Sequence, residues 1–159
     1  MSNLAATPRV ITLKPEPLTA ESFAPYGKVI GKEQLVLTST YFPFFTNVST
    51  LPPSTDPITY INRHHDHHQI FAGLGGGQLV VVVAEPGVSA EELDPSLIHA
   101  FITDGQTAFV FHVDTWHLEP RGVGPAPVRA LNVQATNNRV HTERVELATD
   151  RGYVIHLDV

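Results

Sequence analysis

An all-β domain, built as a small barrel or sandwich, is the fold class that the sequence predicts. Thirteen prolines and eleven glycines among 159 residues separate short apolar segments that are rich in β-branched and aromatic side chains. Many short strands with turn residues between them are typical of barrels and sandwiches. Because no repeat, charge block or low-complexity linker interrupts this pattern, we expect one domain over residues 9–159, preceded by a flexible arm at residues 1–8.

Ten segments fit the strand pattern, being short, β-branched or aromatic, and bounded by Gly, Pro, Asp or Ser. The expected strands are residues 9–14, 28–30, 36–41, 58–62, 69–72, 78–84, 97–103, 107–113, 128–134 and 152–157. One short N-terminal helix is expected at residues 20–24, since Thr19 can cap it and Pro25-Tyr26-Gly27 ends it. A second short turn is expected at residues 89–92.

The connections and one apolar strand predict how the strands are arranged. Residues 80–83 are four valines without alternation, so both faces of this strand should be covered, one by the barrel interior and the other by a second sheet or a subunit. The glycine-rich segment 73–77 is expected to join strands 69–72 and 78–84 as a hairpin. Asp104-Gly105 is expected to form a second, tight hairpin turn.

Composition excludes several classes of site and partner. The chain has no cysteine, so neither a disulfide nor a thiolate metal site can form, and any metal must be held by nitrogen and oxygen ligands. With a net charge of −6 and only ten scattered Lys and Arg residues, nucleic acid is not an expected partner. Residues 1–9 lack a secretory pattern and no apolar stretch approaches ~20 residues, so we expect a cytoplasmic protein with a small-molecule substrate and no membrane contact.

Histidines are the residues best able to carry chemistry. Four of the nine histidines fall within residues 64–68, and two more, His112 and His117, flank Trp116. Imidazole binds divalent metals and transfers protons near neutral pH. The alternative interpretation is a solvated loop or an adventitious metal-binding tract. In an extended chain Arg63, His65, His67 and Gln69 would share one face and His64, Asp66 and His68 the other, unless a turn breaks the alternation.

The order of these motifs resembles that of the cupins, small barrels described as a jelly roll or double-stranded β-helix. Within the cupins the chain is similar to the ureidoglycolate lyase family, and the resemblance runs over residues 12–145. A fainter match covers residues 130–134. The matching stretches are residues 23–30 (FAPYGKVI), Arg63-His64 with Gln69-Ile70-Phe71, residues 80–84 (VVVVA), residues 100–105 (AFITDG), and His112 with Trp116-His117.

The resemblance implies a divalent metal ion, such as Zn, Ni, Mn or Fe, held by His64, Gln69 and His117, and no organic cofactor. Gln69 takes the place of the usual glutamate. Asn62 stands where many metal cupins have their first histidine. These two departures remove one imidazole and one negative charge from the metal site, and one histidine of the 65–68 loop (His65, His67 or His68) could substitute.

The resemblance also implies cleavage of ureidoglycolate to glyoxylate and urea by elimination. Proton transfer is expected from His112, with His65 or a bound water as the second proton-transfer group. Arg63, or the metal held by His64, Gln69 and His117, is expected to bind the substrate carboxylate. Asn132 and Gln134 share a strand face and are expected to bind the ureido group, unless they are surface amides. Trp116 is expected either to form a wall of the pocket or to be a core aromatic.

Two rival functions and one assembly state are also consistent with the sequence. The chain could be another metal-dependent cupin lyase, isomerase or hydrolase acting on a small oxo or hydroxy acid. It could also be a binding module without catalysis. A homodimer is expected, because residues 80–83 and the aromatic run 41–45 offer more apolar surface than a small barrel covers.

Overall fold

The computed structural model of the protein describes residues 7–40, 42–136 and 139–159. None of the helices in these ranges has the length and apolar character needed to cross a membrane. The helical segments are the 3-10 turn η1 (Pro95–Leu97) and α1 (Leu147–Asp150). The strands are β1 (Arg9–Leu13), β2 (Glu16–Pro17), β3 (Gly27–Val29), β4 (Phe44–Leu51), β5 (Tyr60–His64), β6 (Gln69–Gly73), β7 (Leu79–Ala84), β8 (His99–Ile102), β9 (Ala108–Phe111), β10 (Trp116–His117), β11 (Arg121–Gly122), β12 (Val128–Ala135), β13 (Thr142–Glu146) and β14 (Tyr153–Leu157).

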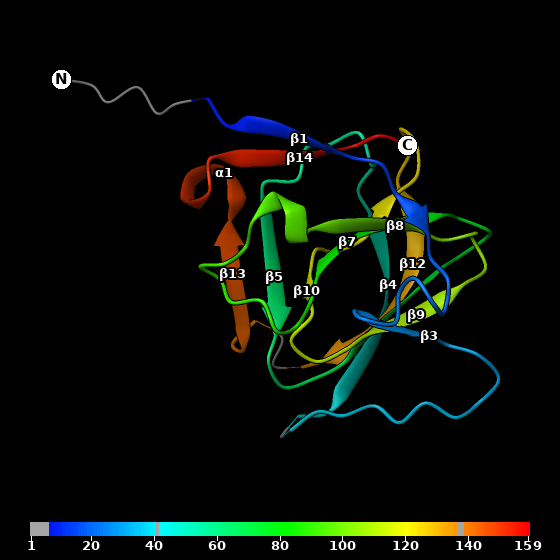
Figure 1. Ribbon diagram of the computed structural model, residues 1–159. Helices are drawn as coiled ribbons and strands as arrows, with labels where there is room; N and C mark the ends of the chain where they lie inside the picture. The colour runs from blue at the N-terminus through cyan, green and yellow to red at the C-terminus, as the bar shows by residue number, and fades with distance from the viewer. Residues whose placement is uncertain (1–6, 41, 137–138) are drawn as a thin grey trace.

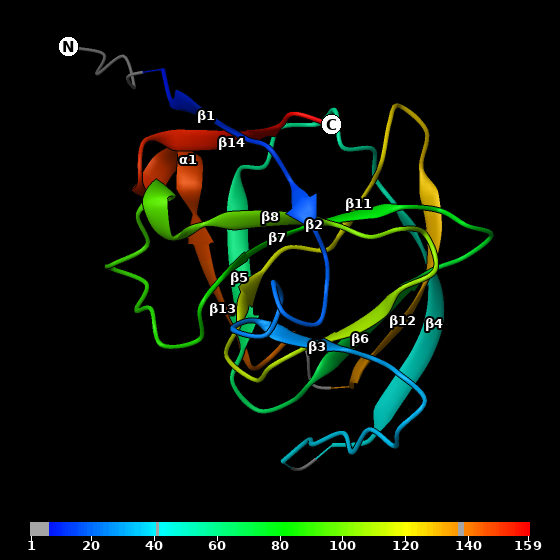
Figure 2. The same ribbon diagram turned by 45° about the vertical axis from the view of Figure 1, so that its right-hand side comes forward.

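These strands form three hydrogen-bonded sheets. A seven-stranded sheet runs in the order β13-β5-β10-β7-β8-β2, with β11 also paired to β7, and a five-stranded sheet runs β3-β9-β6-β12-β4. In Figure 2 these two sheets lie on opposite sides of the barrel interior. The parallel pair β1-β14 forms a third, small sheet above the seven-stranded one (Figure 1). The fold is therefore all-β and built around two facing sheets, as the sequence predicts.

Strand β7 is buried on both faces, as expected from its four valines. Leu79, Val81 and Val83 belong to an inner core between the two large sheets. The same core holds phenylalanine rings in edge-to-face contact, namely Phe23, Phe71, Phe101, Phe109 and Phe111. Val82 and Ala84 belong to an outer core under β1, β14 and α1. The small sheet thus supplies the second cover of β7, so residues 80–83 offer no free surface to a second subunit.

Several expected elements differ from those observed. Residues 20–26 form consecutive turns, and the short helix lies near the other end of the chain at α1. Thr19 caps the turn as expected, since its Oγ1 accepts from the Ser22 N–H at 3.0 Å, but Pro25 and Gly27 follow too soon for a helix to form. Strands β4 and β13 were not anticipated. Residues 36–40 make no strand, and Tyr41 lies outside the described residues, as do residues 1–6 of the expected arm.

Both predicted hairpins are wrong, because each connection crosses between sheets. Strand β6 pairs with β9 and β12, whereas β7 pairs with β8, β10 and β11; likewise β8 and β9 lie in different sheets. The Asp104 carboxylate caps its own turn by accepting from the backbone N–H groups of Gln106 and Thr107. Gly105 adopts a φ of 82° and packs against the backbone of Gly76, so the two connections support each other at one end of the barrel.

Replacing Gly105 by Ala should destabilise the fold more than replacing Gly124. Both glycines have a positive φ, but a Cβ at residue 105 would lie 2.3 Å from the Gly76 carbonyl oxygen, whereas one at residue 124 meets nothing within 4 Å. We expect Gly105→Ala to lower the free energy of unfolding by about 2–4 kcal/mol and Gly124→Ala by about 1 kcal/mol. Urea denaturation measures both. Equal losses of unfolding free energy would show that the contact between Gly105 and the Gly76 backbone contributes nothing to stability.

Candidate functional site

One end of the barrel interior is a polar cavity of about 400 Å³. Its walls come from β5, β10 and β13 of the seven-stranded sheet and from β6 and β12 of the five-stranded sheet. The apolar inner core fills the rest of the space between the sheets. The lining residues are Tyr60, Asn62, His64, Gln69, His117, Glu119, Asn132, Gln134, Arg139, Thr142 and Arg144.

Strand alternation decides which side chains reach this cavity. His117 of β10 pairs with Asn62 of β5, so these two residues point to the same face of the sheet. Their neighbours point to the other face, where Arg63 lies over the Trp116 ring at 4.4 Å from its centroid. The seven-stranded sheet therefore has a polar inner face at this end and a separate set of contacts outside.

The four-residue loop 65–68 brings the two ends of the first motif into one cavity. Strand β5 ends at His64, and β6 begins at Gln69 in the opposite sheet. Strict alternation over residues 63–69 would have placed these two side chains on opposite faces. The loop breaks that alternation, so both His64 and Gln69 line the cavity.

His117 is held rigidly as a neutral imidazole. Its Nδ1 donates to the Thr115 carbonyl oxygen at 2.8 Å, and its ring stacks on Phe111 with centroids 4.3 Å apart. Burial lowers the pKa of His117 to about 4. With the proton on Nδ1, Nε2 presents a lone pair towards Gln69 Oε1 at 3.0 Å.

A row of amides continues from His117 across the five-stranded sheet. Gln69 Nε2 donates to Asn132 Oδ1 at 3.0 Å, and Asn132 Nδ2 donates to Asn47 Oδ1 at 3.1 Å. Gln69 and Asn132 are buried, and Asn47 is exposed on the edge strand β4. Gln134 lies on the same face of β12 as Asn132 and also lines the cavity.

His64 is the second neutral imidazole of the cavity. Burial, followed by the charges of His117 and His67, lowers its pKa to about 3. Its Nδ1 lies 2.9 Å from Thr142 Oγ1, and its ring centroid is 5.0 Å from that of His117. Neither imidazole takes up a proton near neutral pH, so both are suited to metal ligation or hydrogen bonding rather than to general base catalysis.

Charged side chains that the sequence analysis missed complete the cavity. They are Glu119, Arg139 and Arg144. Glu119 is an exposed residue whose carboxyl group is partly desolvated in the cavity wall; this desolvation raises its pKa, and Arg121 opposes the shift. Arg144 lies over the Tyr60 ring at 3.5 Å and pairs with Glu146. One sequence signal could have found Glu119, since it lies two positions beyond the candidate residue His117.

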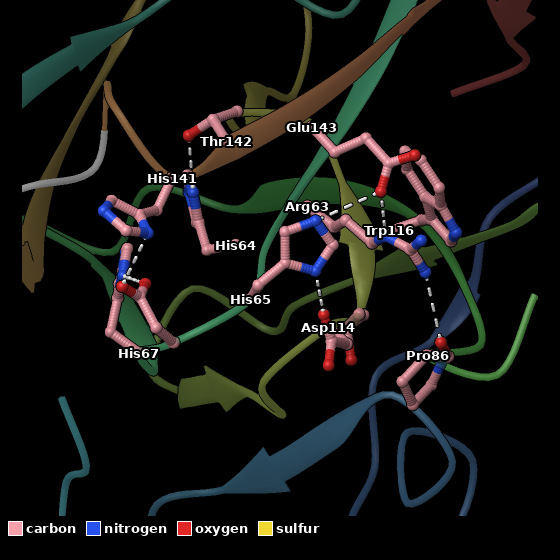
Figure 3. A network of polar contacts seen from close by, with 12 residues as sticks. Arg63, His64, His65, His67, Pro86, Asp114, Trp116, His141, Thr142 and Glu143 are labelled. Atoms are coloured by element: carbon pink, nitrogen blue, oxygen red, sulfur yellow. Dashed lines mark hydrogen bonds and ion pairs between the residues drawn. The ribbon is translucent and has the colours of Figure 1, made fainter. Parts of the chain in front are cut away.

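The structure places Arg63 and His65 outside the cavity, which corrects the expectation that they act on the substrate there. Arg63 Nε donates to Glu143 at 2.7 Å, and His65 lies between Asp114 and Glu143. Figure 3 shows this group apart from the group around His64, His67 and Thr142. Asp114 is the non-glycine residue with a positive φ among those described.

His112 and Trp116 also lie outside the cavity. His112 Nε2 contacts the Ala24 carbonyl oxygen at 3.1 Å, and His112 is not among the residues that line the cavity. Trp116 is fully buried in the outer core, and its Nε1 donates to the Val88 carbonyl at 2.7 Å. It is therefore a core aromatic rather than a wall of the pocket, because its neighbour His117 takes the inward position on β10.

The donor set in the cavity fits a divalent metal ion. His117 Nε2 and Gln69 Oε1 face each other as two acceptors at 3.0 Å. A cation bound by both atoms would relieve this mismatch. A 180° rotation of the Gln69 amide, which places Nε2 against His117, would relieve it too. His64 adds a second imidazole. Within the described residues no three His, Asp or Glu side chains are arranged to hold one ion, so such a site would rest on two imidazoles and one neutral amide oxygen.

Comparison with known proteins identifies the family. The sequence profile of ureidoglycolate lyase matches residues 44–154. The chain is 34% identical over 128 residues to the ureidoglycolate lyase of Pseudomonas aeruginosa (strain LESB58), which covers 67% of this chain and 73% of the relative. It is 30% identical over 127 residues to that of Pseudomonas fluorescens (strain SBW25), covering 67% and 74%. The chain belongs to the ureidoglycolate lyase family. It is therefore a member of a family of lyases, as the resemblance in its sequence implied.

A solved structure of a dTDP sugar isomerase from Desulfovibrio desulfuricans G20 superposes with a TM-score of 0.46. It is 19% identical and the alignment covers 78% of this chain and 82% of that one. A superposition this loose carries no conclusion about function.

The buried imidazoles should make stability depend on pH. An unfolded chain protonates His117 near pH 6.5, whereas the folded protein does so only near pH 4. The free energy of unfolding should therefore fall between about pH 6.5 and pH 4, by on the order of 1–3 kcal/mol from this residue. Urea titrations of His117→Gln should show a shallower fall than wild type. His156→Gln, an exposed control on β14, should not, and equal slopes for all three proteins would contradict the assignment.

Proposed function

We propose that the protein cleaves ureidoglycolate to glyoxylate and urea in the cavity between β5, β10 and β12. The observation that carries this proposal is the composition of the cavity. Guanidinium groups, a row of amides and a carboxyl group with a raised pKa lie around two neutral imidazoles. A small hydroxy acid with a ureido group needs this combination: a cation for its carboxylate, amides for its urea end and one residue that transfers a proton.

Arg139 and Arg144 are the proposed carboxylate anchors. Both line the cavity, and a guanidinium group binds a carboxylate through two parallel hydrogen bonds. Arg144 is already oriented by the Tyr60 ring beneath it. These two residues take the role that the sequence analysis gave to Arg63, which is engaged outside the cavity with Glu143.

The amide row is the proposed binding site for the ureido group. Gln69, Asn132 and Gln134 present both N–H donors and carbonyl acceptors along one wall. A ureido group carries the complementary set, with one carbonyl acceptor and several N–H donors. An oxo or hydroxy acid without a ureido group would make fewer hydrogen bonds to this wall, which disfavours its binding.

Glu119 is the proposed proton-transfer residue. Its carboxylate accepts the proton of the substrate hydroxyl group while the carbon–oxygen double bond of glyoxylate forms and the carbon–nitrogen bond breaks. The same carboxyl group then returns the proton to the departing urea nitrogen, so the reaction consumes and releases no net proton. A carboxyl group with a raised pKa suits both halves of this transfer better than an imidazole with a pKa of about 3 or 4.

A divalent metal ion, where bound, would be held by His64, His117 and Gln69 and would supply Lewis acid polarisation of a substrate oxygen. The protein's own part is to keep both imidazoles neutral, since protonation would compete with ligation. The Nδ1 atom of His117 donates to the Thr115 carbonyl oxygen, and that of His64 hydrogen-bonds to Thr142 Oγ1; contacts of this kind fix the ring orientation of metal-ligating histidines.

Turnover of ureidoglycolate, followed as glyoxylate release, tests the proposal directly. Replacing Glu119 by Gln should lower kcat by about 10²–10⁴-fold with little change in KM, because the amide keeps the shape of the side chain but cannot accept the proton. Glu91→Gln is the matched control on the exposed surface and should behave as wild type. A Glu119→Gln enzyme of full activity would rule out this residue, and a wild-type protein that releases no glyoxylate would rule out the function.

Replacing Arg139 by Ala should raise KM for ureidoglycolate and lower kcat/KM by about 10–100-fold, because a charge-assisted contact to the substrate carboxylate is lost. The matched control is Arg129→Ala, an exposed arginine on β12 outside the cavity. Steady-state kinetics of both variants separate binding from chemistry. An unchanged KM for Arg139→Ala would place the carboxylate elsewhere in the cavity.

A further inference from the structure

Asn62 is a cavity residue that has no part in the mechanism proposed above. Its side chain lines the polar cavity from β5, and its Oδ1 is buried without a hydrogen-bond partner among the described residues. Buried side-chain oxygens are nearly always paired, so an exception in a cavity wall needs an explanation. Because Oδ1 lies within the wall, Nδ2 is the polar atom that this amide has left to present to the cavity.

Strand pairing places Asn62 in the middle of the inner face of the seven-stranded sheet. Strand β5 lies between β13 and β10 (Figure 1), and Asn62 pairs with Arg144 on one side and with His117 on the other. Paired residues point to the same face, and neighbouring strands lie about 5 Å apart. The three side chains therefore form one row, which runs from a proposed carboxylate anchor to the imidazole that contacts Gln69.

The order of this row matches the order of the groups in ureidoglycolate. The carboxylate is at one end of this substrate and the ureido group at the other, and the single carbon between them carries the hydroxyl group. A carboxylate bound to Arg144 and a ureido group on the amide row, which begins at Gln69 beside His117, would place this carbon over Asn62. The hydroxyl oxygen would then lie next to the Asn62 amide.

We propose that Asn62 Nδ2 donates a hydrogen bond to the reacting oxygen of the substrate, which makes Asn62 a catalytic residue. This inference rests on the proposed function. When Glu119 takes the hydroxyl proton, the O–H electron pair forms the carbonyl bond, and the C–N electron pair leaves with the urea nitrogen, which receives that proton. Negative charge develops on the oxygen during this step, and an N–H group already directed at it stabilises the charge. Asn62 keeps its own protons throughout.

The kinetics of Asn62→Ala test this role. The variant should release glyoxylate with a kcat about 10²-fold lower and with little change in KM, because the lost hydrogen bond strengthens only as the oxygen gains charge. Gln106→Ala is the matched control, since Gln106 is an exposed amide outside the cavity, and it should behave as wild type. An unchanged kcat in Asn62→Ala would overturn the inference.

Two ligands that cannot react test the same contact at equilibrium. Carbamoylglycine has a methylene group where the substrate carries its hydroxyl, and oxalurate has a carbonyl group there; both keep the carboxylate and the ureido group. Calorimetric titration should show that wild type prefers oxalurate, and that Asn62→Ala reduces this preference by about 5–10-fold, the value of one hydrogen bond. Its affinity for carbamoylglycine should stay that of wild type, which also shows that the variant is folded.

Two further variants separate this contact from other effects. Gln134→Ala, on the wall proposed to bind the ureido group, should weaken both ligands equally and leave the preference unchanged. Asn62→Asp should lose the preference for oxalurate, because a carboxylate accepts hydrogen bonds and does not donate them. The reversed amide, with Oδ1 in the cavity, would instead accept from the ureido group. Tighter binding of carbamoylglycine by Asn62→Asp would therefore overturn the assignment.

The ligand affinities decide the role of Asn62 separately from the proposed function. A preference for oxalurate that is the same in wild type and Asn62→Ala would overturn the contact, whether or not the wild-type protein releases glyoxylate. A preference that depends on Asn62, in a wild-type protein that releases no glyoxylate, would support the contact and overturn the proposed reaction.

Discussion

The pairing of β10 with β5, in which His117 lies opposite Asn62, is the constraint on which the rest of the site depends. A shift of β10 by one residue would exchange the two faces of this strand. His117 would then enter the outer core, and Trp116 would enter the cavity. The outer contacts oppose such a shift, because Trp116 fills the outer core and Arg63 is bound to Glu143 and the Val88 carbonyl. Packing on the outer face of the sheet therefore determines which side chains line the cavity on its inner face.

The strands predicted from the sequence are those in which apolar residues dominate. Strands in which polar residues take the place of apolar ones were missed. Strand β7 was found because it is apolar on both faces, whereas β4 (FFTNVSTL) and β13 (TERVE) carry many polar residues. One face of β13 lines the cavity, so its inward residues are polar and the usual alternation disappears. Histidines attract attention anywhere in a sequence. Glu119, Arg139 and Arg144 carry no such motif, and only the packing of distant strands brings them together.

The cavity contains two electrostatically different groups of side chains, neutral imidazoles and charged groups. His64 and His117 are imidazoles that burial keeps neutral, with the pKa of His64 at about 3 and that of His117 at about 4. The other walls hold full charges, which are the guanidinium groups and the carboxyl group of Glu119. In the proposed mechanism, neutral lone pairs and transferred protons thus come from different residues. This division explains why a histidine-rich motif does not by itself identify the residue that moves the proton.

The amide row also couples the cavity to the protein surface. Each amide has one donor end and one acceptor end, so Gln69, Asn132 and Asn47 can be satisfied together only if all three run in the same direction. With Gln69 Oε1 towards His117 the row runs one way, and with Gln69 Nε2 towards His117 it runs the other. A cation on His117 Nε2 selects the first direction and a free lone pair selects the second. Whether a cation occupies His117 Nε2 therefore determines the orientation of the exposed Asn47 side chain on β4.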